Sequence, residues 1–198
     1  MSTSAASPRT LVLWDIDHTL IETRGAGRAI YERAFLATTG APLTELAPVS
    51  GRTELDIMHD SLRLNGLHPT GQAIADLATA LARGYEDARE ELATTGRALP
   101  GAKEALETLA RDPTIHQAVL TGNLREVARV KLEVFGLDQY LDLDSSAYGD
   151  DAADRAVLVR VAHGGRRTAQ AADSTVRTPF WSAIRRTTYG QALWPEPG

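Results

Sequence analysis

Residues 11–20 read Leu-Val-Leu-Trp-Asp-Ile-Asp-His-Thr-Leu, and this stretch decides the fold class. Its first four residues are apolar and are followed at once by polar side chains. A short apolar run of this kind is typical of a strand buried on both faces, as the strands of parallel sheets are. We therefore expect a strand at 11–14, with the carboxylates of Asp15 and Asp17 just beyond its carboxyl end.

The residues that follow this strand show helical patterning over about 75 positions. Apolar spacing predicts helices at 25–36, 53–64 and 72–92, the last broken near Gly84. Helices at 102–110, 124–135 and 154–162 then alternate with short strands at 117–120 and 140–143. This order predicts an α/β fold: a parallel, Rossmann-like sheet with an α-helical cap inserted after the first strand.

Polar clusters follow the two clearest strands, and in a parallel sheet such positions face one crevice. The first is Asp15-Ile16-Asp17-His18-Thr19 and the second is Thr121-Gly122-Asn123. Carboxylate and carbonyl oxygens are ligands that Mg²⁺ prefers. A neutralised Asp15 could attack phosphorus, with Asp17 as general acid and base. The alternative for the two aspartates is a solvated turn or a helix cap.

The second cluster is suited to an anion. The Thr121 hydroxyl and the backbone N–H groups of Gly122 and Asn123, at a helix start, would cradle a phosphate. Lys131, on the helix that follows, could reach the same phosphate and offset the charge of the aspartates. The alternatives are simple N-capping for Thr121 and Asn123 and a solvated helix face for Lys131.

Taken in order, 15–20, then 121–123, then Lys131 resembles the haloacid dehalogenase (HAD) superfamily. The closest resemblance is to its phosphoglycolate-phosphatase-like hydrolases, which carry a helical cap, and it covers residues 11–162. In that family a glycine usually follows the second aspartate, whereas this chain has His18. A histidine there implies a strained left-handed turn.

The resemblance implies a role for each motif residue. Asp15 would be the nucleophile and a magnesium ligand. Asp17 would be the general acid and base, and its backbone carbonyl would also bind the metal. Thr121 would hold the phosphoryl oxygens and Lys131 would orient and neutralise them. The further phosphate-binding residues that it implies are Thr19, Gly122 and Asn123.

The resemblance also implies a division of the chain. Residues 1–9 would be a disordered tail, 10–22 and 100–162 the α/β core, and 23–99 the cap. A cap closes over the site, excludes water and recognises the leaving group of the substrate. Arg52 is the cap residue that we expect to touch substrate, and the alternative is a surface arginine at a helix start.

The fourth motif of the family is an apolar strand that ends in Gly-Asp, with another Asp four residues later. Gly149-Asp150-Asp151 has this spelling, but residues 141–148 are polar for a central strand. We therefore expect a polar loop there, and Asp150 or Asp151 remains only an alternative third metal ligand.

The tail at 163–198 lacks helix and strand periodicity and is atypical of the family. Regrouping the codons of residues 180–186 by one base can give Leu-Val-Gly-Asp-Thr-Pro, which is a fourth-motif sequence. We therefore expect a change of reading frame near 162–165, with out-of-frame, truncated sequence after it. The coding DNA tests this expectation directly.

The overall composition limits the kinds of partner that we expect for the chain. The chain has 198 residues, a formal net charge of −5 and no cysteine. An acidic balance gives no support to a nucleic-acid partner, and the absence of cysteine excludes thiolate metal sites. Neither a signal peptide at 1–9 nor an apolar run of roughly 20 residues is present, so we expect a cytoplasmic protein without a membrane partner.

Together these features predict a magnesium-dependent phosphomonoester hydrolase. It would act through an aspartyl-phosphate on a small phosphorylated metabolite. Two alternatives remain: a phosphomutase with the same nucleophile, and a catalytically impaired or non-catalytic HAD-fold protein that lacks the fourth motif. A receiver-type phospho-acceptor domain fits less well, because it has no large helical insertion after its first strand.

Overall fold

The computed structural model describes residues 10–151 and Leu158. At its centre, β1 (Thr10–Trp14) and β4 (Ile115–Val119) pair in parallel along their whole length. A parallel bridge from Leu120 to Ala147 continues the sheet on the far side of β4. The parallel α/β fold predicted from the sequence is therefore confirmed.

The helices lie close to their predicted positions. Their bounds are α1 (Ala26–Thr39), α2 (Glu54–Leu64), α3 (Gly71–Asp87), α4 (Arg89–Thr95), α5 (Ala102–Ala110) and α6 (Arg125–Val134). The predicted break near Gly84 falls instead at Ala88, between α3 and α4. Gly84 has a packing role, because a Cβ there would lie 2.9 Å from the Ile30 side chain of α1.

The strand predicted at 140–143 is wrong. The chain forms a short 3-10 helix, η1 (Asp138–Tyr140), and then donates one backbone hydrogen bond from Asp142 to the Gln117 carbonyl of β4, but it forms a strand bridge only at Ala147. The physical reason is Asp142, whose carboxylate accepts hydrogen bonds from the backbone of Asp144 and Ser145. Such a local turn competes with strand pairing. Of the helix predicted at 154–162, only Leu158 lies within the described residues.

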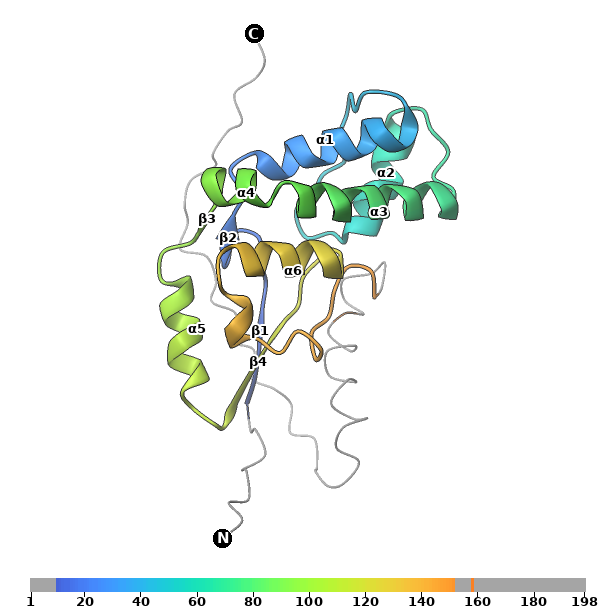
Figure 1. Ribbon diagram of the computed structural model, residues 1–198. Helices are drawn as coiled ribbons and strands as arrows, with labels where there is room; N and C mark the ends of the chain where they lie inside the picture. Colours follow the sequence, from blue (N-terminus) through green and yellow to red (C-terminus); the bar gives the residue numbers. More distant parts are fainter. Residues whose placement is uncertain (1–9, 152–157, 159–198) are drawn as a thin grey trace, which may run out of the picture.

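A second small sheet, not foreseen in the sequence, flanks the helical segment. β2 (Ile21–Glu22) precedes α1, β3 (Arg97–Ala98) follows α4, and the two pair antiparallel. Figure 1 shows α1–α4 gathered beyond the carboxyl ends of β1 and β4. The predicted cap, 23–99, thus begins and ends at one pair of strands.

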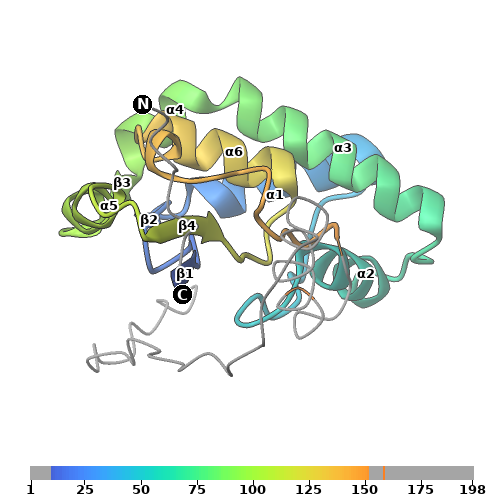
Figure 2. The same ribbon diagram turned by 90° about the horizontal axis from the view of Figure 1, so that it is seen from below.

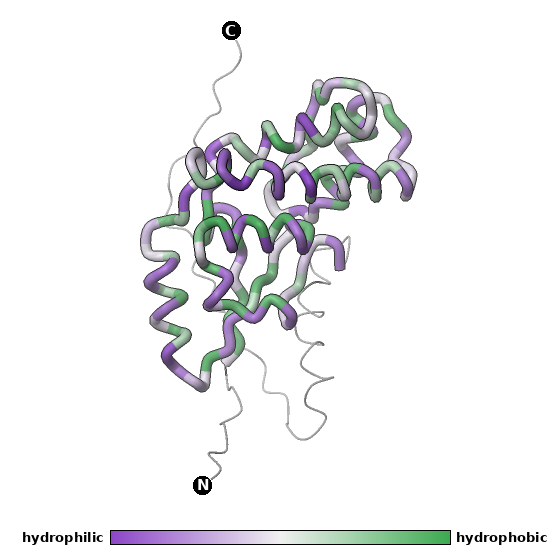
Figure 3. Tube along the Cα trace, viewed as in Figure 1, coloured by the Kyte–Doolittle hydropathy of each residue, from purple (hydrophilic) through white to green (hydrophobic). Residues whose placement is uncertain are grey.

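Helix α6 packs on both halves of the molecule, and Figure 2 shows it between β4 and α3. Val127 and Val130 join the hydrophobic cluster of the α1–α4 segment, whereas Ala128 and Leu132 join that of the sheet. Hydropathy alternates along the helices, as expected where each buries one face (Figure 3). Lys131 lies at the boundary between these two apolar faces. No helix in the described part of the chain is long and apolar enough to cross a membrane.

Candidate active site

The turn after β1 places the two aspartates. Asp15 accepts a hydrogen bond from the backbone N–H of Ile16 on its own carboxylate, at 2.9 Å. His18 has a φ of 60°, which confirms the left-handed conformation predicted for it. This conformation lets the His18 N–H donate to the Ile21 carbonyl and returns the chain to β2. Thr19 lies on the exposed side of this turn.

The structure brings four of the predicted site residues into one hydrogen-bonded cluster. Lys131 Nζ lies 2.8 and 2.9 Å from the two carboxylate oxygens of Asp17 and 2.8 Å from Asn123 Oδ1. Asn123 Nδ2 donates to Asp17 at 2.6 Å and to the Thr121 hydroxyl at 2.8 Å. Segments that are more than 100 residues apart thus meet at the carboxyl ends of two neighbouring strands.

This arrangement decides between the alternatives for the second cluster. Lys131 is only 3% exposed, so it is not part of a solvated helix face. The N-cap of α6 is Leu124, without a side-chain cap, so Thr121 and Asn123 are not its N-caps. The first N–H of the helix, at Arg125, is instead bound by the Asp150 carboxylate at 3.0 Å.

The charges of the cluster are coupled. Burial alone would raise the pKa of Asp17, but the Lys131 charge and the hydrogen bonds from Lys131 and Asn123 hold that pKa below its usual value. Burial would likewise lower the pKa of Lys131, and the Asp17 carboxylate raises it instead. Both groups are therefore charged at neutral pH.

Gly122 is a close contact between the sheet and the helical segment. A Cβ on Gly122 would collide with the Arg52 carbonyl, and a Cβ on Gly149 would collide with the Gly122 carbonyl. The same Gly122 carbonyl accepts the N–H of Glu54 at 2.7 Å. Glycine is required here by the close approach of backbones rather than by an unusual φ.

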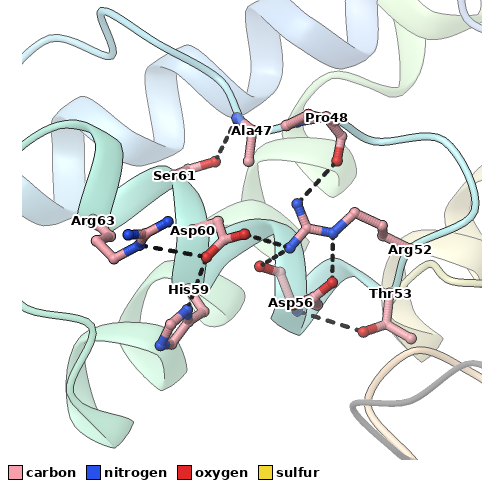
Figure 4. Close-up of polar contacts among 9 residues, drawn as sticks. All are labelled: Ala47, Pro48, Arg52, Thr53, Asp56, His59, Asp60, Ser61 and Arg63. Atoms are coloured by element: carbon pink, nitrogen blue, oxygen red, sulfur yellow. Dashed lines mark hydrogen bonds and ion pairs between the residues drawn. The ribbon is translucent and has the colours of Figure 1, made fainter.

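The Arg52 guanidinium is bound to acids of α2 rather than to this cluster. Its guanidinium donates to Asp56 and Asp60, the latter at 2.7 Å, and to the Pro48 carbonyl (Figure 4). His59 and Arg63 approach the same Asp60 carboxylate. The structure therefore places Arg52 in an ion-pair network on α2 and does not bring it to the predicted catalytic residues.

Two side chains near the site were not singled out in the sequence: Glu54 and Tyr85. The Lys131 ammonium lies 5.3 Å from the centre of the Tyr85 ring. Burial raises the pKa of Glu54 to about 7, with Lys131 opposing and Asp17 reinforcing the shift. For Glu54, the sequence offered one indication: Thr53 is a typical N-cap residue and predicts that α2 starts at position 54. The sequence does not show which residues of the first turn of α2 face the sheet.

Asp150 and Asp151 lie in a turn, as predicted for a polar loop. Asp150 caps α6, and Asp151 accepts the Tyr148 N–H at 2.8 Å. Among the described residues, no group of three or more His, Cys, Asp or Glu side chains could hold a metal ion. The expected fourth motif at 180–186 and the frame change near 162–165 lie outside the described residues.

Comparison with known proteins agrees with this geometry. The model of the family described as haloacid dehalogenase-like hydrolase (HAD) matches residues 12–177. No curated protein sequence matches the chain. A hydrolase from Pseudomonas syringae is 20% identical with a TM-score of 0.57, over 79% of this chain and 69% of that one. A predicted phosphatase from Clostridium acetobutylicum is 16% identical with a TM-score of 0.56, over 81% and 72%. At such identities the similarity establishes the fold.

Proposed function

The chain belongs to the haloacid dehalogenase-like hydrolase family, and from this premise we propose that it is a phosphomonoester hydrolase. Asp15 would attack the phosphorus of a small phosphorylated substrate and expel its alcohol, which forms an aspartyl-phosphate. Asp17 would protonate the departing oxygen. It would then take a proton from the water that hydrolyses the aspartyl-phosphate.

The observation that carries this proposal is the hydrogen-bonded cluster in which the buried Asn123 and Lys131 side chains bind Asp17, two residues after Asp15. Lys131 supplies a fixed positive charge in a water-poor site, where charge stabilisation is strongest. Thr121, Gly122 and Asn123 would bind the phosphoryl oxygens, with Thr19 at the exposed edge. The charged state of Asp17 suits the base step, and an approaching dianionic phosphate raises its proton affinity for the acid step.

The donor set fits Mg²⁺. The Asp15 carboxylate and the Asp17 backbone carbonyl are hard oxygen ligands, and they follow β1 within one turn. When bound, the ion would neutralise the phosphate and the two aspartates. The described residues supply only part of its shell, and Asp150 and Asp151 are engaged elsewhere.

We further propose that residues 23–99 act as the cap, joined to the core through β2 and β3. Its α2 touches the phosphate-binding loop through the Glu54–Gly122 hydrogen bond, so closing and opening would make and break this contact. The non-catalytic alternative is favoured by one observation: among the described residues, no third acidic ligand accompanies Asp15 and Asp17.

Hydrolysis of p-nitrophenyl phosphate with Mg²⁺ tests the proposal. We expect turnover by the full chain, its loss with EDTA, and a fall of at least roughly a thousandfold in Asp15→Asn, which keeps the shape of the side chain. Asp112→Asn, an exposed aspartate in a loop, is the matched control. Equal rates for the full chain and Asp15→Asn would exclude the enzymatic proposal. Isomerised sugar phosphate without phosphate release would instead indicate a mutase.

A further inference from the structure

Tyr85 of α3 reaches Lys131 from the helical segment. The Lys131 ammonium lies over the face of the Tyr85 ring, 5.3 Å from the ring centre. A cation within about 6 Å of a ring centre is attracted by the negative face of the ring, and the attraction is strongest where water is excluded. Water is excluded here, because Lys131 is only 3% exposed and Tyr85 only 5%. The ring therefore acts directly on the positive charge of the proposed site.

The ring lies beside an ammonium whose hydrogen bonds are already in use. A lysine ammonium has three N–H donors. Lys131 Nζ lies 2.8 and 2.9 Å from the two carboxylate oxygens of Asp17 and 2.8 Å from Asn123 Oδ1. The ring face stabilises the cation without accepting any of these three hydrogen bonds. A carboxylate in its place would compete with Asp17, and also with an incoming phosphate, for the same protons.

The hydroxyl end of Tyr85 is fixed by the start of α1. A Cβ on Gly27 would lie 2.9 Å from the Tyr85 hydroxyl and 3.1 Å from Thr23 Oγ1. In a closely packed interior the ring could avoid such a Cβ only by tilting. Burial raises the pKa of Tyr85 to about 12, and Lys131 opposes this rise through its charge and its interaction with the hydroxyl. The phenol is therefore neutral at physiological pH.

Ion pairs hold the end of α3 against α6, the helix that carries the lysine. Glu86, the residue after Tyr85, lies 3.8 Å from Arg129 of α6. Arg89, at the start of α4, lies 2.6 Å from Glu133 of α6. The two long helices lie side by side, with α6 between β4 and α3 (Figure 2). The ring is thus held in place by contacts on both sides of it in the sequence.

We propose that Tyr85 is a positioning residue that holds the Lys131 ammonium against Asp17 and Asn123. The helical segment thereby supplies part of the catalytic arrangement in addition to covering it. Without the aromatic face, the ammonium would be held less firmly in this geometry, and it would stabilise the charge of the phosphoryl group less well. This inference rests on the proposed role of Lys131 in phosphate-ester hydrolysis.

Lysine-selective labelling tests the contact directly, because the chain has only two lysines, Lys103 and Lys131. With ¹³C-labelled lysine in the full chain, NMR records the ε-methylene protons of both. Protons over an aromatic face are shielded, so Tyr85→Leu should move the Lys131 signal downfield. Tyr85→Phe keeps the ring and removes only the hydroxyl, so its Lys131 signal should stay close to the wild-type position. Lys103, exposed on α5, is the internal reference and should not move.

Hydrolysis of p-nitrophenyl phosphate by the same variants gives the functional readout. We expect kcat to fall about tenfold in Tyr85→Leu, the scale of a desolvated cation–π contact, and to stay within about threefold in Tyr85→Phe. Tyr31→Leu is the matched control, because Tyr31 is also 5% exposed and belongs to the same hydrophobic cluster. It removes an identical ring from the helical segment and should leave both kcat and the Lys131 signal close to wild type.

Gly27→Ala tests the contact from the hydroxyl side while the ring is retained. It should shift the Lys131 signal, and adding Tyr85→Phe should bring the signal back toward the wild-type position, because the collision with the hydroxyl is removed. An unmoved Lys131 signal in Tyr85→Leu, or a kcat equal to that of Tyr31→Leu, would overturn the inference. If Tyr85→Leu does not fold, an unmoved signal in Gly27→Ala would overturn it instead.

The proposed function is judged separately from this contact. Hydrolysis by the wild-type chain with an unmoved Lys131 signal in Tyr85→Leu refutes only the positioning role of Tyr85. The expected NMR shifts without any hydrolysis by the wild-type chain refute the enzyme and leave the contact between Tyr85 and Lys131 in place.

Discussion

Two ion-pair clusters lie on either side of Gly122, and they differ in surroundings rather than in geometry. In the core cluster, Lys131 Nζ is 2.8 Å from Asp17; in the α2 cluster, Arg52 is 2.7 Å from Asp60. The Lys131 side chain is 4% exposed, whereas that of Arg52 is 21% exposed. Similar distances therefore do not imply similar energies, because the buried cation of the first pair is screened less by water than the partly exposed cation of the second.

The two cations, Lys131 and Arg52, are also suited to different roles. Lys131 lies at the carboxyl ends of two strands, where it contacts Asp17 after β1 and Tyr85 of α3. Arg52, two residues before α2, binds Asp56 and Asp60 on consecutive turns of that helix. A cation that bridges distant segments in a buried site is suited to catalysis, whereas one that bridges neighbours on a helix surface contributes local stability. The following predictions test this division.

The largest effect is expected for Lys131→Met, which removes the buried cation. Asp17 would lose its main partner, and the free energy of unfolding at pH 8 should fall by about 3 kcal/mol. This is the lower end for a buried pair, because the Asp17 side chain keeps 39% exposure. Urea unfolding measures the loss. Lys103→Met, on an exposed position of α5, should change stability by less than about 0.5 kcal/mol. Equal losses of unfolding free energy in Lys131→Met and Lys103→Met would contradict the special role given to the buried cation.

Gly122→Ala should disturb the contact that joins the two clusters. The added Cβ would collide with the Arg52 carbonyl, which is backbone and cannot move alone. We expect a loss of about 2 kcal/mol, the usual scale for overpacking, together with increased amide exchange at the start of α2. Gly66→Ala, at a site of open space, is a control for steric effects, although its φ of 74° carries its own backbone cost. Unchanged exchange in α2 would show that the cap does not rest on Gly122.

Glu54→Gln should alter the pH dependence of the free energy of unfolding, because Glu54 lies between the two clusters. The folded-state pKa of Glu54 is about 7, above its ordinary value of 4.5, so ionising it in the folded chain is unfavourable. Wild-type stability should therefore fall as pH rises from 4.5 to 7, and the variant should not show this fall. We expect the variant to be more stable by about 2 kcal/mol at pH 8 and equal at pH 4.5. Parallel unfolding curves for the two proteins would contradict the burial of this carboxyl.

The smallest effect is expected for Arg52→Ala. Its ion pairs are partly exposed and join residues close together in the sequence, so the loss should be about 1 kcal/mol or less and should shrink in high salt. Hydrolysis of p-nitrophenyl phosphate should stay within about threefold of wild type, because the guanidinium is bound to Asp56 and Asp60 rather than to Asp17. A fall of a hundredfold would restore Arg52 to the site, as the sequence had suggested.

The sequence was informative where chemistry depends on strand ends. Asp17, Thr121, Asn123 and Lys131 were predicted to meet because parallel strands bring their carboxyl ends to one edge, and they do meet. The expectation that Arg52 touches substrate depended on the rotation of α2, which begins two residues after it. That rotation is set by packing against α1, α3 and Gly122 and cannot be read from the spacing within the helix.

Short elements were harder to predict for a related reason. β2 and β3 have two residues each, too few to show alternation, and their pairing joins positions about 75 residues apart. The 140–143 segment has strand-like residues, but the local hydrogen bonds of Asp142 determine its conformation. In both cases tertiary pairing or a side-chain turn outweighed intrinsic preference.

The β2–β3 pair has a consequence for engineering. Because Ile21 lies opposite Ala98, the chain leaves and re-enters the core at neighbouring points. The whole segment between β2 and β3 could be exchanged for another one whose two ends pair in the same way. Simple deletion would not suffice, because Val127 and Val130 of α6, and Leu124 just before it, would lose their apolar cover. A transplanted segment must therefore bring its own hydrophobic face for α6, and that requirement defines which segments are interchangeable.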